Sequence, residues 1–533
     1  MKIENIKIYN TISNARKYWA LLLFSIFPIS SLQAQDSIIV TNHIIDSQIK
    51  NQIFKYPVNY TKQYIKDFTF TEVSYEYQKN EFARKQIANE INTYQFLAQG
   101  YYTTTSKWKL FGNLSLKKID EKDLGWVLSD DRSEEQEVIM PHYFFVPRKA
   151  NWTNQQYVVN GGLSKQLTRK ISFASKLSYE VAKYSRNLDP RPQIISRKIG
   201  GEIQLGYDLK ENHKIFALAN YTRSDKDFSY RYKDDHSNVE VKPETYLRFN
   251  TGYGRIINYF KSNYYNSTRF LYKENQNKIG FGYNFSNKNT RFTALYYNQK
   301  ANNNFYSDVF DNEDNLRLKI ETTTNHAELF ALHQWGKKEL KSTLKYDISD
   351  GKNFDVKNNG YNYKNKLNAI SWLTTLSKKT GSHIDYLLGF DMLYQQNEYH
   401  DVMATTDLEI NSLNTGIFAS RDFAFEKSKL NTTVSFNMYF PLPSSKLDYY
   451  DTSGGTNSTF FNDVIIHDYV VSTTNYFAPA IRLEYSYPVK NNKTVVFFTN
   501  FKEKLALKKQ NDYNAIINTN TTYWIQCGVQ LNY

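Results

Sequence analysis

The chain ends in the stretch Tyr523-Trp524-Ile525-Gln526-Cys527-Gly528-Val529-Gln530-Leu531-Asn532-Tyr533. Apolar residues occupy every second position of it and mostly polar residues lie between them, a period of two that predicts a β-strand with two different faces. The strand reaches the chain terminus itself, whereas a soluble domain usually ends in a few loose polar residues. Taken alone, the stretch also fits the last strand of a soluble β-sandwich.

The same alternation recurs from Phe68 onward. It is clearest in segments such as Thr69–Tyr77, Ile384–Tyr394 and Phe477–Tyr487. Short turns alternate with long loops, of which 223–275 is the longest, and the segments number about 18. This pattern predicts an all-β fold, a transmembrane antiparallel up-and-down β-barrel with short periplasmic turns and long extracellular loops. A β-propeller would need a repeat of about 40 to 50 residues, and the sequence has none.

Composition agrees with a barrel. The chain has 44 Tyr and 35 Phe although its mean hydropathy is only −0.63. Transmembrane barrels combine lipid-facing residues with polar lumen-facing ones, and aromatic girdles mark both membrane interfaces. No later segment reaches about 18 consecutive apolar residues, which excludes a helical membrane protein. The single cysteine, Cys527, lies on the apolar face of the last strand and cannot form an internal disulfide.

The net charge of +14 comes from scattered Lys and Arg rather than from one basic stripe. This distribution argues against nucleic acid as a partner. We expect the basic residues to face outer-membrane lipid and lipopolysaccharide, with simple solvation as the alternative.

The N-terminus has the features of a secretory signal peptide. Basic residues precede the apolar core Tyr18–Ile29, and Leu32-Gln33-Ala34 forms a cleavage site before Gln35. The chain is therefore expected to divide into a signal peptide (1–34), an N-terminal periplasmic tether or plug-like segment (35–66) and a transmembrane barrel (67–533).

Four residues of the final strand resemble the C-terminal assembly signal of bacterial outer-membrane β-barrels: Gln526, Gly528, Leu531 and Tyr533. In that family the barrel assembly machinery recognises the signal by pairing with the strand. The resemblance implies this machinery as a partner during insertion, and the outer membrane as the location after cleavage near Ala34-Gln35.

Asp36–Thr41 resembles the short energy-coupling box of TonB-dependent receptors. Those receptors carry a large plug domain between the box and the barrel, and the chain before Phe68 has no room for one. An ordinary β-prone tether is the alternative.

The length and the abundance of Asn, Lys and Tyr look like those of outer-membrane proteins of Bacteroidota. The loop Asp189-Pro190-Arg191-Pro192 is similar to one in an uncharacterised family of such barrels, known as a domain of unknown function. The resemblance covers the whole mature chain and carries no established activity.

The nine histidines form no metal-binding or catalytic pattern. His326 and His333 lie seven residues apart, so within one strand they point to opposite sides. His400-Asp401 and His467-Asp468 fall in predicted external loops. There they resemble the acidic-histidine sites of omptin barrel proteases, although solvation of such adjacent pairs is the expected state.

Two carboxylates, Asp385 and Asp391, share one strand and are predicted to face the lumen. They lie roughly 20 Å apart, whereas two carboxylates that act on one bond need about 5 to 9.5 Å. We interpret them as candidate lumen lining, facing Arg482 and Glu484 on another strand. No nucleophile elbow, phosphate loop or Cys/His cluster is present, so we expect no enzyme, no cofactor and no metal.

Three functional hypotheses remain. The first is an accessory or structural subunit of an outer-membrane transport or assembly complex, with other barrels or lipoproteins as partners. The second is a passive, porin-like diffusion channel for small polar solutes, because a barrel of about 16 to 18 strands can enclose water. The third is an enzyme carried by the loops at His400 or His467. We expect the first, and the second depends on whether segment 35–66 or loop 223–275 folds into the lumen.

Overall fold

The computed structural model describes residues 44–63, 65–130, 142–232, 247–252, 256–259, 268–307, 315–381, 383–449, 460–489, 493–508 and 521–533. The expected signal peptide and the candidate energy-coupling box, Asp36–Thr41, lie outside these residues.

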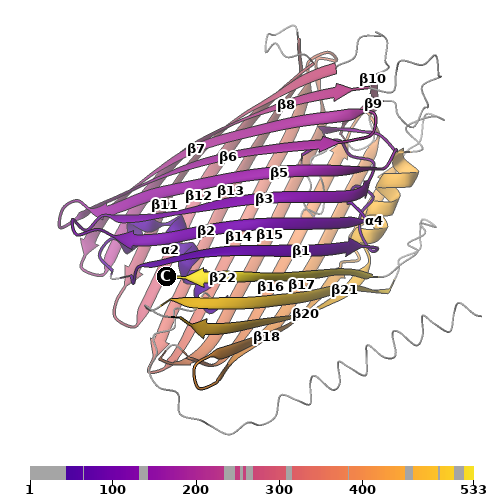
Figure 1. Ribbon diagram of the computed structural model, residues 1–533. Helices are drawn as coiled ribbons and strands as arrows, with labels where there is room; N and C mark the ends of the chain where they lie inside the picture. Colours follow the sequence, from indigo (N-terminus) through magenta and orange to yellow (C-terminus); the bar gives the residue numbers. More distant parts are fainter. Residues whose placement is uncertain are drawn as a thin grey trace, which may run out of the picture.

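The described chain forms a closed antiparallel β-barrel of 18 strands (Figure 1). Each strand pairs with its neighbours along the chain, and the first pairs with the last to close the barrel. β18 and β19 count as one barrel strand because both pair with β17. The strands are β1 (Phe68–Asn80), β2 (Glu90–Thr103), β3 (Lys109–Leu124), β5 (Ala150–Gln166), β6 (Ile171–Arg186), β7 (Arg191–Lys210), β8 (His213–Arg231), β11 (Thr268–Ser286), β12 (Thr290–Tyr306), β13 (Leu316–Trp335), β14 (Lys338–Asp355), β15 (Gly360–Thr380), β16 (His383–Asp401), β17 (Thr406–Ala424), β18 (Lys429–Pro441) with β19 (Lys446–Tyr449), β20 (Asn475–Pro488), β21 (Thr494–Lys508) and β22 (Thr521–Asn532). This confirms the predicted fold class.

The last strand is the seam of the barrel. β22 pairs with β21 on one side and with β1 on the other, where Val529 lies opposite Val73. The N–H of Tyr533 adds a hydrogen bond of 2.9 Å to the carbonyl of Thr69. Because both edges of β22 are paired, the closed barrel leaves no free sheet edge between its first and last strands.

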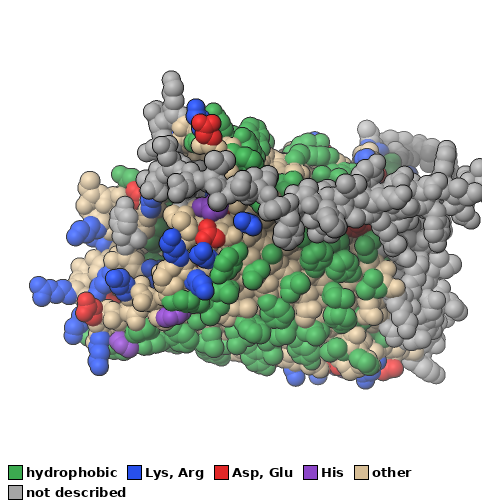
Figure 2. All heavy atoms as spheres, turned by 90° about the horizontal axis from the view of Figure 1, so that it is seen from below, with side chains coloured by type: hydrophobic (Ala, Val, Ile, Leu, Met, Phe, Trp, Pro, Cys, Tyr) green, Lys and Arg blue, Asp and Glu red, His purple; other side chains and the backbone are tan. Residues whose placement is uncertain are grey.

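The outer face of the barrel is apolar. Large exposed hydrophobic residues lie at alternate positions of the strands, for example Ile279, Leu388 and Ile417. Figure 2 shows hydrophobic side chains over the middle of the wall, with Lys and Arg gathered toward the end where the short turns lie. An apolar band bordered by charge is the surface that a lipid bilayer solvates best.

Replacing Leu388 by arginine is expected to destabilise the barrel by about 2 to 4 kcal/mol, the cost of a charged side chain near the bilayer midplane. Leu388 lies on the outer face of β16 and is 53% exposed. Equilibrium unfolding from lipid vesicles measures the loss. Gln395→Arg on the lumen face of the same strand is the control, and equal stability of the two variants would contradict the assigned faces.

The strands are longer than a bilayer requires. A transmembrane strand needs about 9 to 11 residues, whereas β15 has 21. The predicted loop 223–275 is therefore too long: β8 continues to Arg231 and β11 already begins at Thr268, with Thr268 opposite Tyr230. Beyond the membrane the outward positions carry charges, such as the pair Arg269–Asp227 at 3.2 Å. The apolar alternation ends there while the backbone pairing continues.

The N-terminal segment lies inside the barrel. Helix α2 (Ile44–Lys55) and the 3-10 turn η1 (Pro57–Tyr60) occupy the lumen at the end where the short turns lie, which we call the short-turn end (Figure 1). Tyr56 and Val58 pack on lumen-facing Phe216, and Ile53 packs with Tyr101. Apolar residues therefore hold the segment against the inner wall.

No helix in the described part of the chain is long and apolar enough to cross a membrane.

The opposite, long-loop end has a core of its own. A three-stranded sheet of β4 (His142–Phe145), β9 (Leu247–Thr251) and β10 (Ile256–Tyr259) packs there. The π-helical turn η4 (Phe461–Ile465) continues into α4 (Ile466–Ser472), which lies at this end in Figure 1. Phe144 contacts Phe270 with a ring-centroid distance of 4.3 Å. We call this assembly the outer cap.

The burial of His142 shows that the core of the outer cap excludes water. Burial lowers the pKa of its imidazole to about 3, so the ring is neutral at ordinary pH. Its Nε2 lies 2.7 Å from the Nδ2 of Asn353 on the barrel wall, and its ring meets that of Tyr363 edge-on. The cap is thus packed against the strands as a core is.

Candidate functional site in the barrel lumen

One buried carboxylate anchors the N-terminal segment to the wall. Glu328 on β13 is 3% exposed and accepts hydrogen bonds from three side chains of the segment. The distances are 2.6 Å from Gln52 Nε2, 2.5 Å from Lys55 Nζ and 3.2 Å from Tyr56 Oη. A carboxylate that is removed from water needs such partners, because an unpaired buried charge costs several kcal/mol.

The wall itself orients this carboxylate. His326, two residues earlier on the same face of β13, approaches Glu328 Oε2 to 3.4 Å with Nε2. Its Nδ1 lies 2.6 Å from Asp347 Oδ1 on β14, and its ring stacks on Tyr297 with a ring-centroid distance of 4.5 Å. His333 points to the other side of the strand, where its Nδ1 lies 2.9 Å from the hydroxyl of Thr290. The anchor is therefore a network and not a single ion pair.

Barrel side chains also cap the end of α2. The last carbonyls of a helix have no partner within the helix. Here Lys176 and Gln204 donate to the carbonyl of Lys55 at 2.9 and 2.8 Å. Lys214 donates to the carbonyl of Val58 at 2.8 Å. The cations lie where the negative end of the helix dipole favours them.

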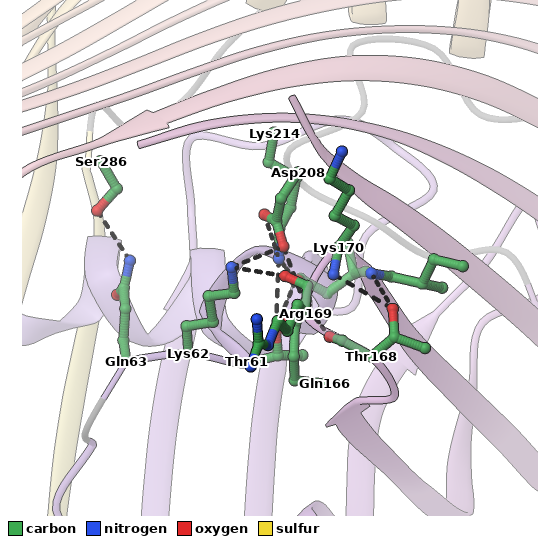
Figure 3. Close-up of polar contacts among 12 residues, drawn as sticks. Thr61, Lys62, Gln63, Gln166, Thr168, Arg169, Lys170, Asp208, Lys214 and Ser286 are labelled. Carbon is green, nitrogen blue, oxygen red and sulfur yellow. Dashed lines mark hydrogen bonds and ion pairs between the residues drawn. The ribbon is translucent and has the colours of Figure 1, made fainter. Parts of the chain in front are cut away.

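The end of the segment is held at the short-turn end of the wall (Figure 3). Lys62 forms an ion pair of 3.0 Å with Asp208 on β7, and Gln63 donates to the hydroxyl of Ser286 at 2.9 Å. Thr61 donates to Gln166 Oε1 at 2.8 Å, and Gln166 donates in turn to Asp208 at 2.9 Å. The chain is thus tied down just before it enters the barrel wall.

A cavity of about 520 Å³ lies between α2 and the wall. Its lining is rich in amides, hydroxyls and paired charges, with two phenylalanine rings. Glu202 is shared there by Lys176 at 2.6 Å and by Lys278 at 2.9 Å. The side chains that matter below are Asn51, Asn113, Asn160, Lys345, Phe54 and Phe111.

Three of the four candidate lumen-lining residues, Asp391, Arg482 and Glu484, lie on the inner faces of their strands, but not as one cluster. Asp385 does not, because the register of β15 and β16 shifts beside it and turns it toward an outward lysine. Asp385 pairs with Lys378 at 3.0 Å. Arg482 pairs with Glu484 at 2.6 Å on its own strand, β20. Asp391 lies opposite Gly416 of β17 in the register, where a Cβ on that glycine would meet its carboxylate. The structure thus brings Arg482 and Glu484 together and gives Asp385 a different partner.

The four residues of the candidate assembly signal divide between the two faces of β22. Gly528 faces inward against Phe498, where an added Cβ would come within 2.5 Å of the ring, so the position requires glycine. Gln526 lies two positions away on the same face, and Leu531 lies on the outer face. Lys493 lies 4.9 Å from the centre of the Tyr533 ring. Recognition by the assembly machinery stays a prediction.

The two acidic-histidine pairs lie in regular structure and not in the predicted loops, His400-Asp401 at the end of β16 and His467-Asp468 in α4. His400 bonds Asp407 across the hairpin at 2.6 Å instead of its neighbour Asp401, and both partners are more than half exposed. His467 contacts Asp468 at 3.2 Å in α4. Among the residues that the structure describes, no group of three or more His, Cys, Asp or Glu could hold a metal ion.

Sequence reasoning missed the anchor network. Glu328 and Lys55 lie 273 positions apart, and no local pattern connects them. The available signal was a pair of ionisable residues, His326 and Glu328, at alternate positions directly before the apolar run Leu329 to Leu332. An inward charge in a transmembrane barrel needs a partner, which pointed to something charged inside the lumen.

A closed barrel with an apolar outer face and its own N-terminal segment in the lumen defines a plugged transmembrane β-barrel protein. The chain belongs to a family of unknown function, DUF6850, whose family model matches residues 57–533. This confirms the predicted membership of an uncharacterised family. No curated protein matches the chain at a significant level.

Solved structures with a similar course of the chain include outer-membrane receptors and transporters. The ferric preacinetobactin receptor BauA of Acinetobacter baumannii has 10% identity and a TM-score of 0.36, covering 88% of this chain and 80% of its own. The FrpB iron transporter of Neisseria meningitidis has 10% identity and a TM-score of 0.40, with coverage of 89% and 82%. The outer-membrane transporter YddB of Escherichia coli has 7% identity and a TM-score of 0.37, with coverage of 88% and 81%. Likeness at this level assigns no ligand and no role to this chain.

Proposed function

We propose that this protein is a non-enzymatic outer-membrane barrel that acts as a gated diffusion channel for small polar solutes, with residues 44–63 as the gate. The observation that carries the proposal is the position of this segment, inside the lumen and bound to the buried carboxylate of Glu328. The barrel fold and the resemblance of the final strand to an assembly signal support the outer membrane as its location, and the composition supports an origin in Bacteroidota.

The contacts of the gate favour a reversible closure. Much of its attachment consists of ion pairs and hydrogen bonds to lumen groups such as Lys176, Gln204 and Lys214. When the segment moves, water can replace each of these partners. The apolar contacts of Tyr56 and Val58 with Phe216 oppose that movement and set its cost. Water then reaches the polar walls of the lumen from the short-turn end.

The accessory-subunit hypothesis remains the second candidate because of the outer cap. Its core joins more residues than any other cluster of the described chain, from Leu124 and Phe144 to Phe461 and Tyr469. A rigid, well-packed surface at the long-loop end is suited to hold a lipoprotein or a second barrel.

The channel is tested by swelling of vesicles that contain the full chain in solutions of small neutral sugars. Lys55→Gln removes the ion pair with Glu328, in which the lysine side chain is 40% exposed. We expect up to about fivefold faster swelling than for the native chain, the effect of losing about 1 kcal/mol at a partly solvated pair.

Lys352→Gln is the matched control, because it breaks an ion pair of 3.2 Å with Glu321 in which both side chains are exposed. This variant should swell at the native rate. If no protein-dependent swelling occurs with any chain, the channel proposal fails and the accessory hypothesis takes its place.

A further inference from the structure

We infer that the cavity between α2 and the barrel wall is a binding site for a sugar-sized, hydroxyl-rich solute that carries one carboxylate or phosphate group. The inference rests on the proposed function, because it names the solute class that the gated lumen would take. Its volume of about 520 Å³ lies within the range of small-molecule sites, about 300 to 1,000 Å³.

The neutral part of the lining is suited to hydroxyl groups. Asn113 and Asn160 lie side by side on β3 and β5, with Nδ2 of the second donating to Oδ1 of the first at 3.1 Å. Each amide retains further donor or acceptor capacity. Asn51 adds a third amide from the exposed face of α2, within the same cavity. Amides that both donate and accept match hydroxyls, which do the same.

Two aromatic rings add an apolar surface. Phe54 of α2 and Phe111 of β3 line the cavity and meet edge-on, with ring centroids 5.5 Å apart. A sugar ring has an apolar C–H face as well as hydroxyl groups. The phenylalanine rings suit the C–H face, and the amides beside them suit the hydroxyl groups.

The charges of the lining favour an anion. Three lysines (Lys55, Lys176 and Lys345) face two carboxylates (Glu202 and Glu328). Lys55 and Lys176 form ion pairs of 2.5 and 2.6 Å with these carboxylates. Lys345 forms no ion pair or hydrogen bond with any other residue of the described chain.

Lys345 is well placed to supply the charged contact. It extends from β14 into the lumen, opposite Glu328 on one side and Ser371 on the other in the register. Glu328 is already neutralised by the segment, so it competes little for this lysine. An anionic group at Lys345 would lie beside the gate itself, which couples solute binding to the position of α2.

Calorimetric titration of the full chain in detergent tests the site with four probes: glucuronate, glucose 6-phosphate, glucose and glucosamine. We expect glucuronate and glucose 6-phosphate to bind at least about tenfold more tightly than glucose, because one charge-assisted hydrogen bond contributes that much to affinity. Glucosamine, which carries a positive charge, should bind no better than glucose. Absence of binding for both anionic probes, or equal affinity for glucuronate and glucose, would overturn the inference.

Variants separate the two parts of the site. Lys345→Gln should lower the affinity for glucuronate about tenfold and leave that for glucose unchanged, and Lys345→Arg should restore the preference for the anion. Asn113→Ala should weaken both. Lys502→Gln, which removes a lysine of a separate lumen cavity, is the control and should change neither.

The outcomes also separate this inference from the proposed function. Vesicle swelling without binding of the anionic probes overturns the site and leaves the channel. Loss of the glucuronate preference in Lys345→Arg as well as in Lys345→Gln overturns the role of the charge.

Discussion

Replacing Glu328 by glutamine is expected to release the N-terminal segment from the lumen. The substitution keeps the shape of the side chain but removes the charge that Lys55 and His326 face, and it leaves the contacts with Gln52 and Tyr56 weaker. Breaking a buried ion pair by removing one partner costs about 3 to 5 kcal/mol. Because the Lys55 side chain is 40% exposed, we expect the lower end, about 3 kcal/mol.

A loss of this size raises the population of displaced segment by about a hundredfold. Hydrogen exchange of residues 44–63 in the full chain measures it directly. Single-channel recording should show correspondingly more frequent openings. The barrel strands should retain their protection, because the wall does not depend on the segment for its backbone hydrogen bonds.

Glu321→Gln is the matched control for Glu328→Gln. It lies on the same strand, but its ion pair with Lys352 is exposed, and such pairs contribute about 1 kcal/mol or less. If both variants exchange residues 44–63 at the native rate, Glu328 is not the anchor and the polar attachment of the gate is wrong.

Replacing Phe144 by alanine is expected to unfold the outer cap while the barrel remains closed. Phe144 is 2% exposed and its ring lies within 4.9 Å of three others, those of Tyr230, Phe249 and Phe270. Truncating a fully buried phenylalanine costs about 3 to 5 kcal/mol, since the cavity that remains adds to the lost burial.

Limited proteolysis of the full chain in detergent measures the result. Cleavage near 142–145 and 247–252 should become at least about a hundredfold faster, the equivalent of 3 kcal/mol. The heat-modifiable migration of the closed barrel should be unchanged. Phe281→Ala is the control, because Phe281 is 64% exposed on the outer wall and contributes nothing to the cap. Loss of the barrel together with the cap would contradict the separation of the two.

The sequence predicted the wall of the barrel because the signal for it is local. Val73, Leu388 and Tyr485 lie on the outer face, as the alternation predicted, since neighbouring side chains of a strand point to opposite sides whatever the strand pairs with. The short turns are also a local signal, and they predicted that successive strands pair with each other. The ends of β8 and β11 were misjudged because the apolar alternation stops at the membrane surface, whereas the backbone pairing of Thr268 with Tyr230 continues beyond it.

The contents of the lumen were decided by the tertiary structure. Which inward residues share a neighbourhood depends on how the closed barrel places distant strands and on where the N-terminal segment docks. Lys55 and Glu328 meet across 273 positions, and Lys345, which lies opposite Glu328 in the register, has no ionic partner among the described residues. A period of two specifies the face of each residue but not the residue that it meets across the lumen, so the sequence determined the wall and the folded chain determined the site.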